Sequence, residues 1–213
     1  MEDESSYSDP MVEALDSVED SVMDATTVVV ACTVLAADLV RIHRMIDYAF
    51  HSRTTFSLTR MPKNVCWDES WIPETLTYKD QPISLRVLGT AMSLDVVQDD
   101  EEGQRLCLSL ELLRPVDQLK LLEILRMGTK QQGALTEYMH WSYTKINEND
   151  VFPHVYDATT TLRPKPMMRE LGLSCVGRGD IVVVEGTCEK EGDSGGAWSV
   201  TFNMASISIV VKS

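Results

Sequence analysis

Paired cysteines, long apolar stretches and complete catalytic motifs are all missing from this sequence, and each absence excludes a class of protein. The five cysteines are widely spaced, and no two of them form a CxxC pair: Cys32, Cys66, Cys107, Cys175 and Cys188. Zinc ribbons, whose ligands come in such pairs, are therefore excluded. An odd number of scattered cysteines predicts reduced and mostly buried thiols, as in intracellular proteins.

Apolar runs are short throughout the chain. The longest mainly apolar run, Val28 to Ala37, has ten residues and includes Thr33. A transmembrane helix needs about 20 residues, so this run predicts a segment of the protein core. The N-terminus is acidic, whereas a secretory signal begins basic and continues apolar. We therefore expect an intracellular protein with no signal peptide and no transmembrane helix.

Basic residues are absent from the first 24 positions, which hold nine acidic residues. The whole chain has a net charge of −14, and residues 25–213 carry 24 acids against 19 bases, a net charge of −5. We predict a disordered acidic tail over 1–24, suited to docking on basic partners, and a single domain over 25–213. Nucleic acid is an unlikely partner on this charge, because its binding depends on Lys and Arg neutralising phosphates.

Motifs for cofactors and metals are also missing. The chain has no Gly-rich phosphate loop, no HExxH helix, no EF-hand loop and no dinucleotide fingerprint. The acidic run over 99–102 falls in a predicted exposed turn, where solvated carboxylates are expected in place of a metal site. We therefore assign no cofactor and no catalytic, cofactor-binding or metal-binding residue.

One short segment resembles a catalytic motif. Gly192 to Gly196 reads Gly-Asp-Ser-Gly-Gly, the nucleophile motif of chymotrypsin-like serine proteases, in which a histidine activates the serine. The family's histidine context is missing, since His51 follows a predicted helix, and only 19 residues follow Ser194. Glycine, Asp and Ser are also typical of a loop between hairpin strands. We interpret the segment as such a loop, and a serine hydrolase that uses Ser194 is the enzyme alternative.

Periodicity predicts the elements of the first two thirds of the domain. Alternating apolar residues predict strands over 83–97 and 106–112, joined by an acidic turn at 98–103. Helical spacing predicts helices over 26–50, 118–127 and 134–146. Residues 53–78 show little periodicity and are interpreted as an ordered loop region with aromatic anchors.

The last third predicts strands over 155–162, 181–185 and 198–211, and a short helix over 166–171. In the final strand the apolar residues occupy even positions up to Met204 and odd positions from Ile207. This slip of one residue predicts a bulge near Ala205–Ser206, or two short strands. We hypothesise that Ile207 to Val211 is an exposed sheet edge. The predicted fold class is α+β, a mainly antiparallel sheet packed with two or three helices.

The order of elements over residues 83–204 resembles rhabdovirus-type matrix proteins. The strand at 181–185, then Cys188, a turn and the strand that starts at Trp198 carry the resemblance at the C-terminal end. The resemblance implies self-assembly beneath a membrane, peripheral membrane contact, and nucleocapsid and envelope proteins as partners. It also implies a location in the host cytoplasm and the virion.

The predicted function is therefore that of a non-enzymatic structural protein that assembles through protein–protein interaction. Two alternatives stay open: a chymotrypsin-like serine hydrolase that uses Ser194, and a β-barrel adaptor that binds nucleic acid. The strands suit the adaptor, but the charge does not.

Overall fold

A computed structural model describes Asp38, Ile42 and residues 54–71, 73–99, 103–128, 138–144, 154–192 and 198–213. Asp38 and Ile42 are both helical. The rest of the helix predicted over 26–50 lies outside the described residues, as does the acidic tail predicted over 1–24. In the part of the chain that is described, no helix is long and apolar enough to cross a membrane.

Most of the described chain is β-structure. The strands are β1 Thr55–Ser57, β2 Cys66–Asp68, β3 Glu74–Tyr78, β4 Gln81–Pro82, β5 Ser84–Asp99, β6 Gly103–Leu112, β7 Met139–Thr144, β8 His154–Asp157, β9 Arg169–Leu171, β10 Ile181–Gly192 and β11 Trp198–Val211. The long helix is α3 Pro115–Gly128, and three short 3-10 helices are η1 Leu58–Arg60, η2 Lys165–Met167 and η3 Leu173–Cys175.

Five of these strands close into a barrel. Antiparallel pairs join β10 to β5, β5 to β6, β6 to β7 and β10 to β11, and a parallel pair joins β7 to β11. Around the barrel the strands therefore follow in the order β5, β6, β7, β11 and β10. When the five strands are numbered by their order in the chain, this reads first, second, third, fifth and fourth. This is the topology of the OB-fold, a partly open five-stranded Greek-key barrel.

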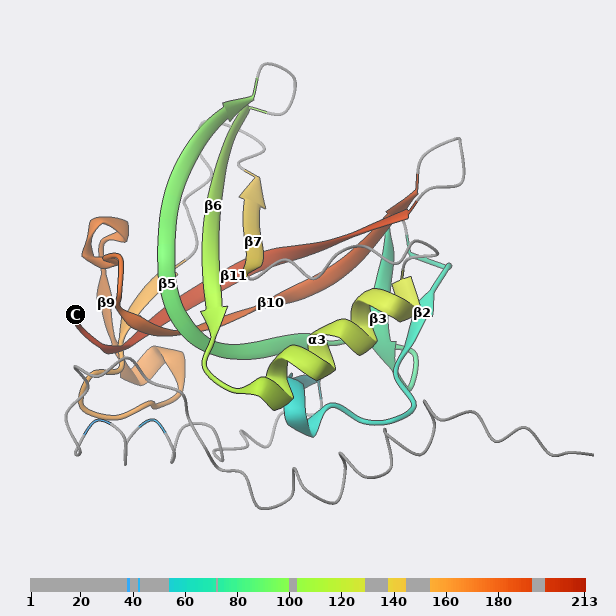
Figure 1. Ribbon diagram of the computed structural model, residues 1–213, viewed down its shortest axis with the longest axis horizontal. Helices are drawn as coiled ribbons and strands as arrows, with labels where there is room; N and C mark the ends of the chain where they lie inside the picture. The colour runs from blue at the N-terminus through green and yellow to red at the C-terminus, as the bar shows by residue number, and fades with distance from the viewer. Residues whose placement is uncertain are drawn as a thin grey trace, which may run out of the picture.

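The long strand β5 makes the closure possible because it belongs to both halves of the barrel. Its first half pairs with β10 and its second half with β6, and the strand bends strongly between them (Figure 1). Gly89 lies at the crossover, where a Cβ atom would come within 2.5 Å of the carbonyl oxygen of Glu111. Met92 then forms a β-bulge against β6. A glycine and a bulge both increase local twist and bending.

The barrel interior is packed with apolar side chains from every barrel strand. Fully buried examples are Leu85, Leu106, Leu108, Leu110, Trp141, Val184, Cys188 and Ile207. The helix α3 lies below β10 in Figure 1, packs against η1 and β2, and adds Leu121 and Ile124 to the same core. The prediction of a helix over 118–127 is thus confirmed, although the helix starts three residues earlier, at Pro115.

The predicted α+β class is wrong, because the described chain is mostly β-sheet with a single long helix. Residues 139–144, inside the helix predicted over 134–146, form β7. Burial alternates along it: Met139 and Trp141 are buried, and His140 is exposed. The apolar spacing also fits a helix, and pairing with β6 and β11 decides the conformation.

Two further segments differ from their predictions. The predicted loop region over 53–78 contains β1, β2 and β3, and the predicted helix over 166–171 is the end of η2 followed by the strand β9. These strands are short: β2 and β3 lie at one end of the sheet and β9 at the other, and β1 pairs with β5 off the main strand order. A strand of three residues is too short to show the alternation that identifies it in sequence.

The final strand confirms one prediction and contradicts another. Glu185 pairs with Ser206 and Gly186 pairs with Met204, so Ala205 forms the predicted bulge. The hypothesis of an exposed edge at Ile207 to Val211 is wrong, because β11 pairs with β10 on one side and with β8 on the other.

Candidate nucleic-acid interface

The outer surface of the second and third barrel strands is the candidate site. The inward positions of β6 and β7 are the leucines of the core and Met139 and Trp141, so the alternate positions face outward. We call this surface the β6–β7 face. It comprises Arg105, Cys107 and Ser109 of β6 and His140 and Ser142 of β7, flanked by Asp95 of β5 and Asn203 of β11.

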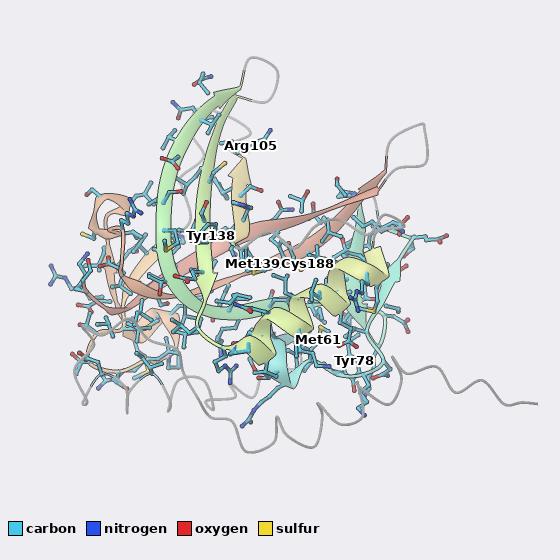
Figure 2. The ribbon with its side chains drawn as sticks, viewed as in Figure 1. Met61, Tyr78, Arg105, Tyr138, Met139 and Cys188 are labelled. Carbon is cyan, nitrogen blue, oxygen red and sulfur yellow. The ribbon has the colours of Figure 1, made fainter. Side chains whose placement is uncertain are left out.

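The histidine of this face is held in place by its cross-strand neighbour. Ser109 lies directly opposite His140 in the β6–β7 register. The hydroxyl oxygen of Ser109 lies 3.1 Å from Nδ1 of His140. Because the side chain of His140 is exposed, its ring is both oriented by the protein and open to solvent. Tyr138, half-buried, directly precedes the strand (Figure 2).

A polar row crosses the face next to this pair. Cys107 lies opposite Asp95 on one side and opposite Ser142 on the other, and Ser142 lies opposite Asn203. Arg105 is two residues before Cys107 on the same strand, toward the β5–β6 hairpin end (Figure 2). The face therefore offers a cation, an oriented ring, hydroxyls, an amide and the carboxylate of Asp95, and exposed Glu111, two residues after Ser109 on the same side of β6, adds a second carboxylate.

Several acids of the described chain are neutralised by cations away from this face. Glu185 of β10 contacts Nη2 of Arg86 at 2.6 Å and Nζ of Lys165 at 2.7 Å. Burial alone would raise the pKa of Glu185, but these two cations outweigh it and lower that pKa. Glu74 pairs with Lys190 at 2.8 Å. The net charge of the domain is therefore a poor guide to the charge of any one face.

The pKa of Asp117 is raised, unlike that of Glu185, because Asp117 is more deeply buried. Both of its carboxylate oxygens accept hydrogen bonds from Arg114, at 2.7 and 2.8 Å. Even so, burial raises the pKa of Asp117, and the contact with Arg114 offsets this only in part. This pair is at the start of α3 and takes no part in the β6–β7 face.

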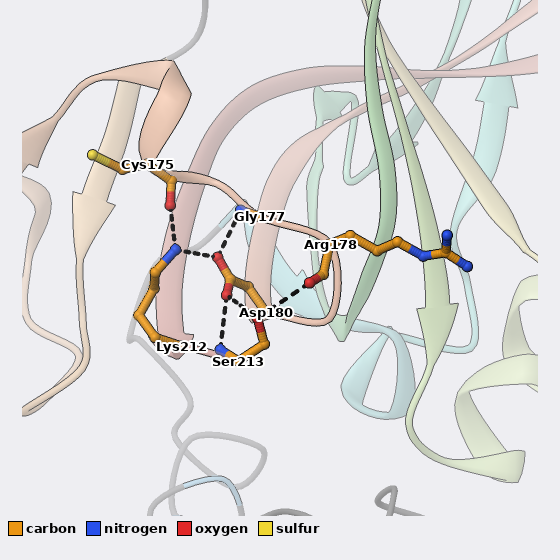
Figure 3. A network of polar contacts seen from close by, with 6 residues as sticks. All are labelled: Cys175, Gly177, Arg178, Asp180, Lys212 and Ser213. Atoms are coloured by element: carbon orange, nitrogen blue, oxygen red, sulfur yellow. Dashed lines mark hydrogen bonds and ion pairs between the residues drawn. The ribbon is translucent and has the colours of Figure 1, made fainter.

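Another buried carboxylate, Asp180, ties the C-terminal residues to the barrel (Figure 3). It accepts hydrogen bonds from the backbone N–H of Gly177 at 2.7 Å and of Ser213 at 2.9 Å, and it pairs with Nζ of Lys212 at 2.7 Å. Burial acts to raise the pKa of Asp180, and the hydrogen bonds and Lys212 together lower it. The arrangement is structural, because the carboxylate is fully enclosed.

Ser194, the candidate nucleophile of the Gly-Asp-Ser-Gly-Gly motif, lies outside the described residues. Its flanks are described: β10 ends at Gly192 and β11 starts at Trp198, and these two residues pair. The Gly-Asp-Ser-Gly-Gly segment therefore connects the two strands of a hairpin. His43 and His51 also lie outside the described residues, and His154 lies on β8, where its Nδ1 contacts the carboxylate of Glu170. Among the described residues, no group of His, Cys, Asp and Glu could hold a metal ion.

The sequence does not reveal the β6–β7 face, because the apolar spacing over 134–146 predicts a helix where β7 forms. The available signal was the alternation of polar His140 and Ser142 with Met139, Trp141 and Tyr143. That pattern favours a half-buried strand. The cross-strand contact between Ser109 and His140 joins residues 31 positions apart, and no local pattern predicts it.

The fold defines the class: the chain is an OB-type β-barrel with a polar outer face on its second and third strands. No family model matches the sequence, and the comparison with curated proteins gives no match. Similar solved structures include gp2.5, a single-stranded DNA-binding protein of bacteriophage T7, with 13% identity and a TM-score of 0.41, over 61% of this chain and 87% of that one. Another is the single-stranded DNA-binding protein of bacteriophage Enc34 in complex with ssDNA, with 10% identity and a TM-score of 0.43, over 71% of this chain and 98% of that one. At these values the similarity carries no functional argument, so function has to come from the chain's own geometry.

These findings correct the resemblance to rhabdovirus-type matrix proteins. The similar structures are phage single-stranded DNA-binding proteins, and the described chain is a β-barrel where a layered α+β core was expected. The assembly function, the nucleocapsid and envelope partners and the virion location inferred from that resemblance are withdrawn with it. The expectation that nucleic acid is an unlikely partner is corrected too, because it rested on net charge, and Glu185 and Glu74 are paired with cations away from the β6–β7 face. That expectation was wrong because the net charge of a domain does not give the distribution of charge over its surface.

Proposed function

We propose that this protein binds single-stranded nucleic acid on the β6–β7 face. The observation that carries the proposal is the order of the barrel strands, with the third strand parallel to the fifth. In barrels of this topology, oligonucleotides and oligosaccharides bind on the face of the second and third strands and on the flanking hairpin loops. The corresponding elements here are β6 and β7, flanked by the β5–β6 and β10–β11 connections.

The side chains on this face favour nucleic acid as the ligand. The exposed ring of His140 can stack on a nucleobase, and Ser109 holds it in a fixed orientation. Arg105 supplies a guanidinium group for a phosphate or a base plane. Ser142 and Asn203 add hydrogen-bonding groups in the adjacent row. This is a binding function, and no catalytic step is assigned to Ser194.

A single strand suits the face better than a duplex. Stacking on a protein ring requires a base that has left its own stack, as bases in single strands readily do. A duplex would instead have to be held through its phosphates, which requires many cations. Because Arg105 is the one Lys or Arg among the described residues assigned to this face, we expect modest affinity and a shallow dependence on salt.

Fluorescence anisotropy with labelled strands of about 15 nucleotides, near the upper site size of one OB domain, tests the proposal. The expected result is binding of single strands at low salt and much weaker binding of the matching duplex. Replacing His140 with Ala should weaken single-strand binding about tenfold, the order of one lost stacking contact, and His140→Phe should retain most of it.

The matched control is His154→Ala, which removes an exposed histidine from β8, outside the five barrel strands. It should leave the affinity unchanged. The proposal fails if neither DNA nor RNA strands bind at low salt, or if the two alanine variants weaken binding equally.

A further inference from the structure

Asp95 stands at one end of the polar row that crosses the β6–β7 face. The row runs from Asp95 on β5 through Cys107 and Ser142 to Asn203 on β11. Asp95 is exposed. Among the described residues, no side chain hydrogen-bonds to or pairs with its carboxylate, unlike those of Glu185 and Asp180.

This carboxylate limits how a strand can lie on the face. It repels phosphate groups, whereas Arg105, at a diagonal position on the neighbouring strand, attracts them. The sugar–phosphate backbone is therefore excluded from the β5 side of the face, and bases are the part of the strand that can approach Asp95.

A carboxylate also discriminates between bases. It only accepts hydrogen bonds at neutral pH. The exocyclic amino group of cytosine donates to such an acceptor, and Asp and Glu are the side chains that read it in DNA. Uracil carries a carbonyl oxygen at the same ring position, and two acceptors facing each other repel.

We propose that Asp95 makes the β6–β7 face select bases that carry an exocyclic amino group, with cytosine preferred over uracil and thymine. The selection rests on the proposed function, since it requires a strand on this face. Asp95 acts as a specificity-determining residue: it adds a hydrogen bond for one class of base and a repulsion for the other.

Strands of about 15 deoxycytidines or deoxyuridines test this, because the two bases differ only at the hydrogen-bonding edge. At neutral pH and low salt, the wild-type protein should bind the deoxycytidine strand about tenfold more tightly, the ratio that one hydrogen bond to a charged group supplies. In Asp95→Asn the ratio should fall toward one. The amide can donate as well as accept, so the main change is tighter binding of the deoxyuridine strand.

The matched control is Asp80→Asn, which makes the same chemical change in the exposed turn between β3 and β4. It should keep the wild-type ratio, and thermal unfolding should confirm that both variants fold. Equal affinities for the two strands, or a preference for deoxyuridine, overturn the selection while leaving strand binding intact. A ratio unchanged in Asp95→Asn overturns the role of Asp95. Absence of binding to either strand overturns the proposed function itself.

Discussion

At the scale of single residues, the described structure separates buried carboxylates that stabilise the fold from an exposed one that can meet a ligand. Asp180 is fully enclosed and receives hydrogen bonds from the backbone N–H groups of Gly177 and Ser213 and from Lys212. Asp95 is exposed and has no such contacts among the described residues. The same chemical group therefore has two uses, and its surroundings decide which.

Replacing Asp180 with Asn should lower the free energy of unfolding by about 1–3 kcal/mol at neutral pH, because Lys212 loses its charged partner. The sign of the pH dependence follows from the lowered pKa of Asp180. The contribution of Asp180 to the free energy of unfolding is complete above pH 3.8, the ordinary pKa of an aspartate. It is lost as the pH falls through the lower pKa that Asp180 has in the folded protein. Urea unfolding of both proteins across the acid range measures this.

Asp180→Asn should therefore lose stability less steeply than the wild-type protein as the pH falls. Glu69→Gln, which neutralises an exposed carboxylate, should follow the wild-type profile. Identical acid profiles for the wild-type protein and Asp180→Asn would show that Asp180 does not contribute in this way.

At the scale of elements, the β10–β11 hairpin depends on a glycine that faces the barrel core. A Cβ atom on Gly186 would lie 1.9 Å from the carbonyl oxygen of Asn203 and 2.6 Å from Cζ3 of Trp141. Gly186 is next to the register shift that makes Ala205 a bulge. The missing side chain lets the indole ring of Trp141 fill the interior directly against the backbone of β10.

Gly186→Ala should therefore destabilise the protein by about 3 kcal/mol or more, since either the bulge or the Trp141 ring has to move. Denaturant unfolding followed by tryptophan fluorescence measures the loss and also reports on Trp141. Gly172→Ala is the control, because the nearest atom to its added Cβ would be the hydroxyl of Ser174 at 3.7 Å. A loss for Gly186→Ala no larger than that for Gly172→Ala would contradict the packing argument.

At the scale of the whole molecule, a ligand that binds the closed barrel should stabilise it. Because the β6–β7 face is formed by strands from distant parts of the chain, the unfolded chain has no such face. A single strand present at 100 times its dissociation constant should add about 2.7 kcal/mol to the stability. For a domain of this size that is a rise in Tm of about 5–10 °C.

Differential scanning fluorimetry with and without the strand measures this shift. The matching duplex should raise Tm much less, and His140→Ala should shift less than the wild-type protein at the same strand concentration. If the strand binds but leaves Tm unchanged, it binds the folded and unfolded chains alike, and the β6–β7 face is not its site.

Local patterns were sufficient for part of the fold. Alternation over 83–97 and 106–112 predicted β5 and β6, and spacing after Pro115 predicted α3. The change from even to odd positions around Ala205 predicted a bulge found at that residue. These features are recoverable because the pleat and the helical turn impose their period on neighbouring residues.

The closed barrel and its binding face, in contrast, were decided only in the tertiary structure. Trp141 and Phe202 pair across 61 positions of sequence, and His140 meets Ser109 across 31. Local spacing around Met139 fits a helix as well as a strand, and the partners on β6 and β11 select the strand. The sequence determined which side chains are available and the alternating period of several strands. Strand pairing in three dimensions determined which of those side chains share a surface, because strand partners need not be neighbours in the chain.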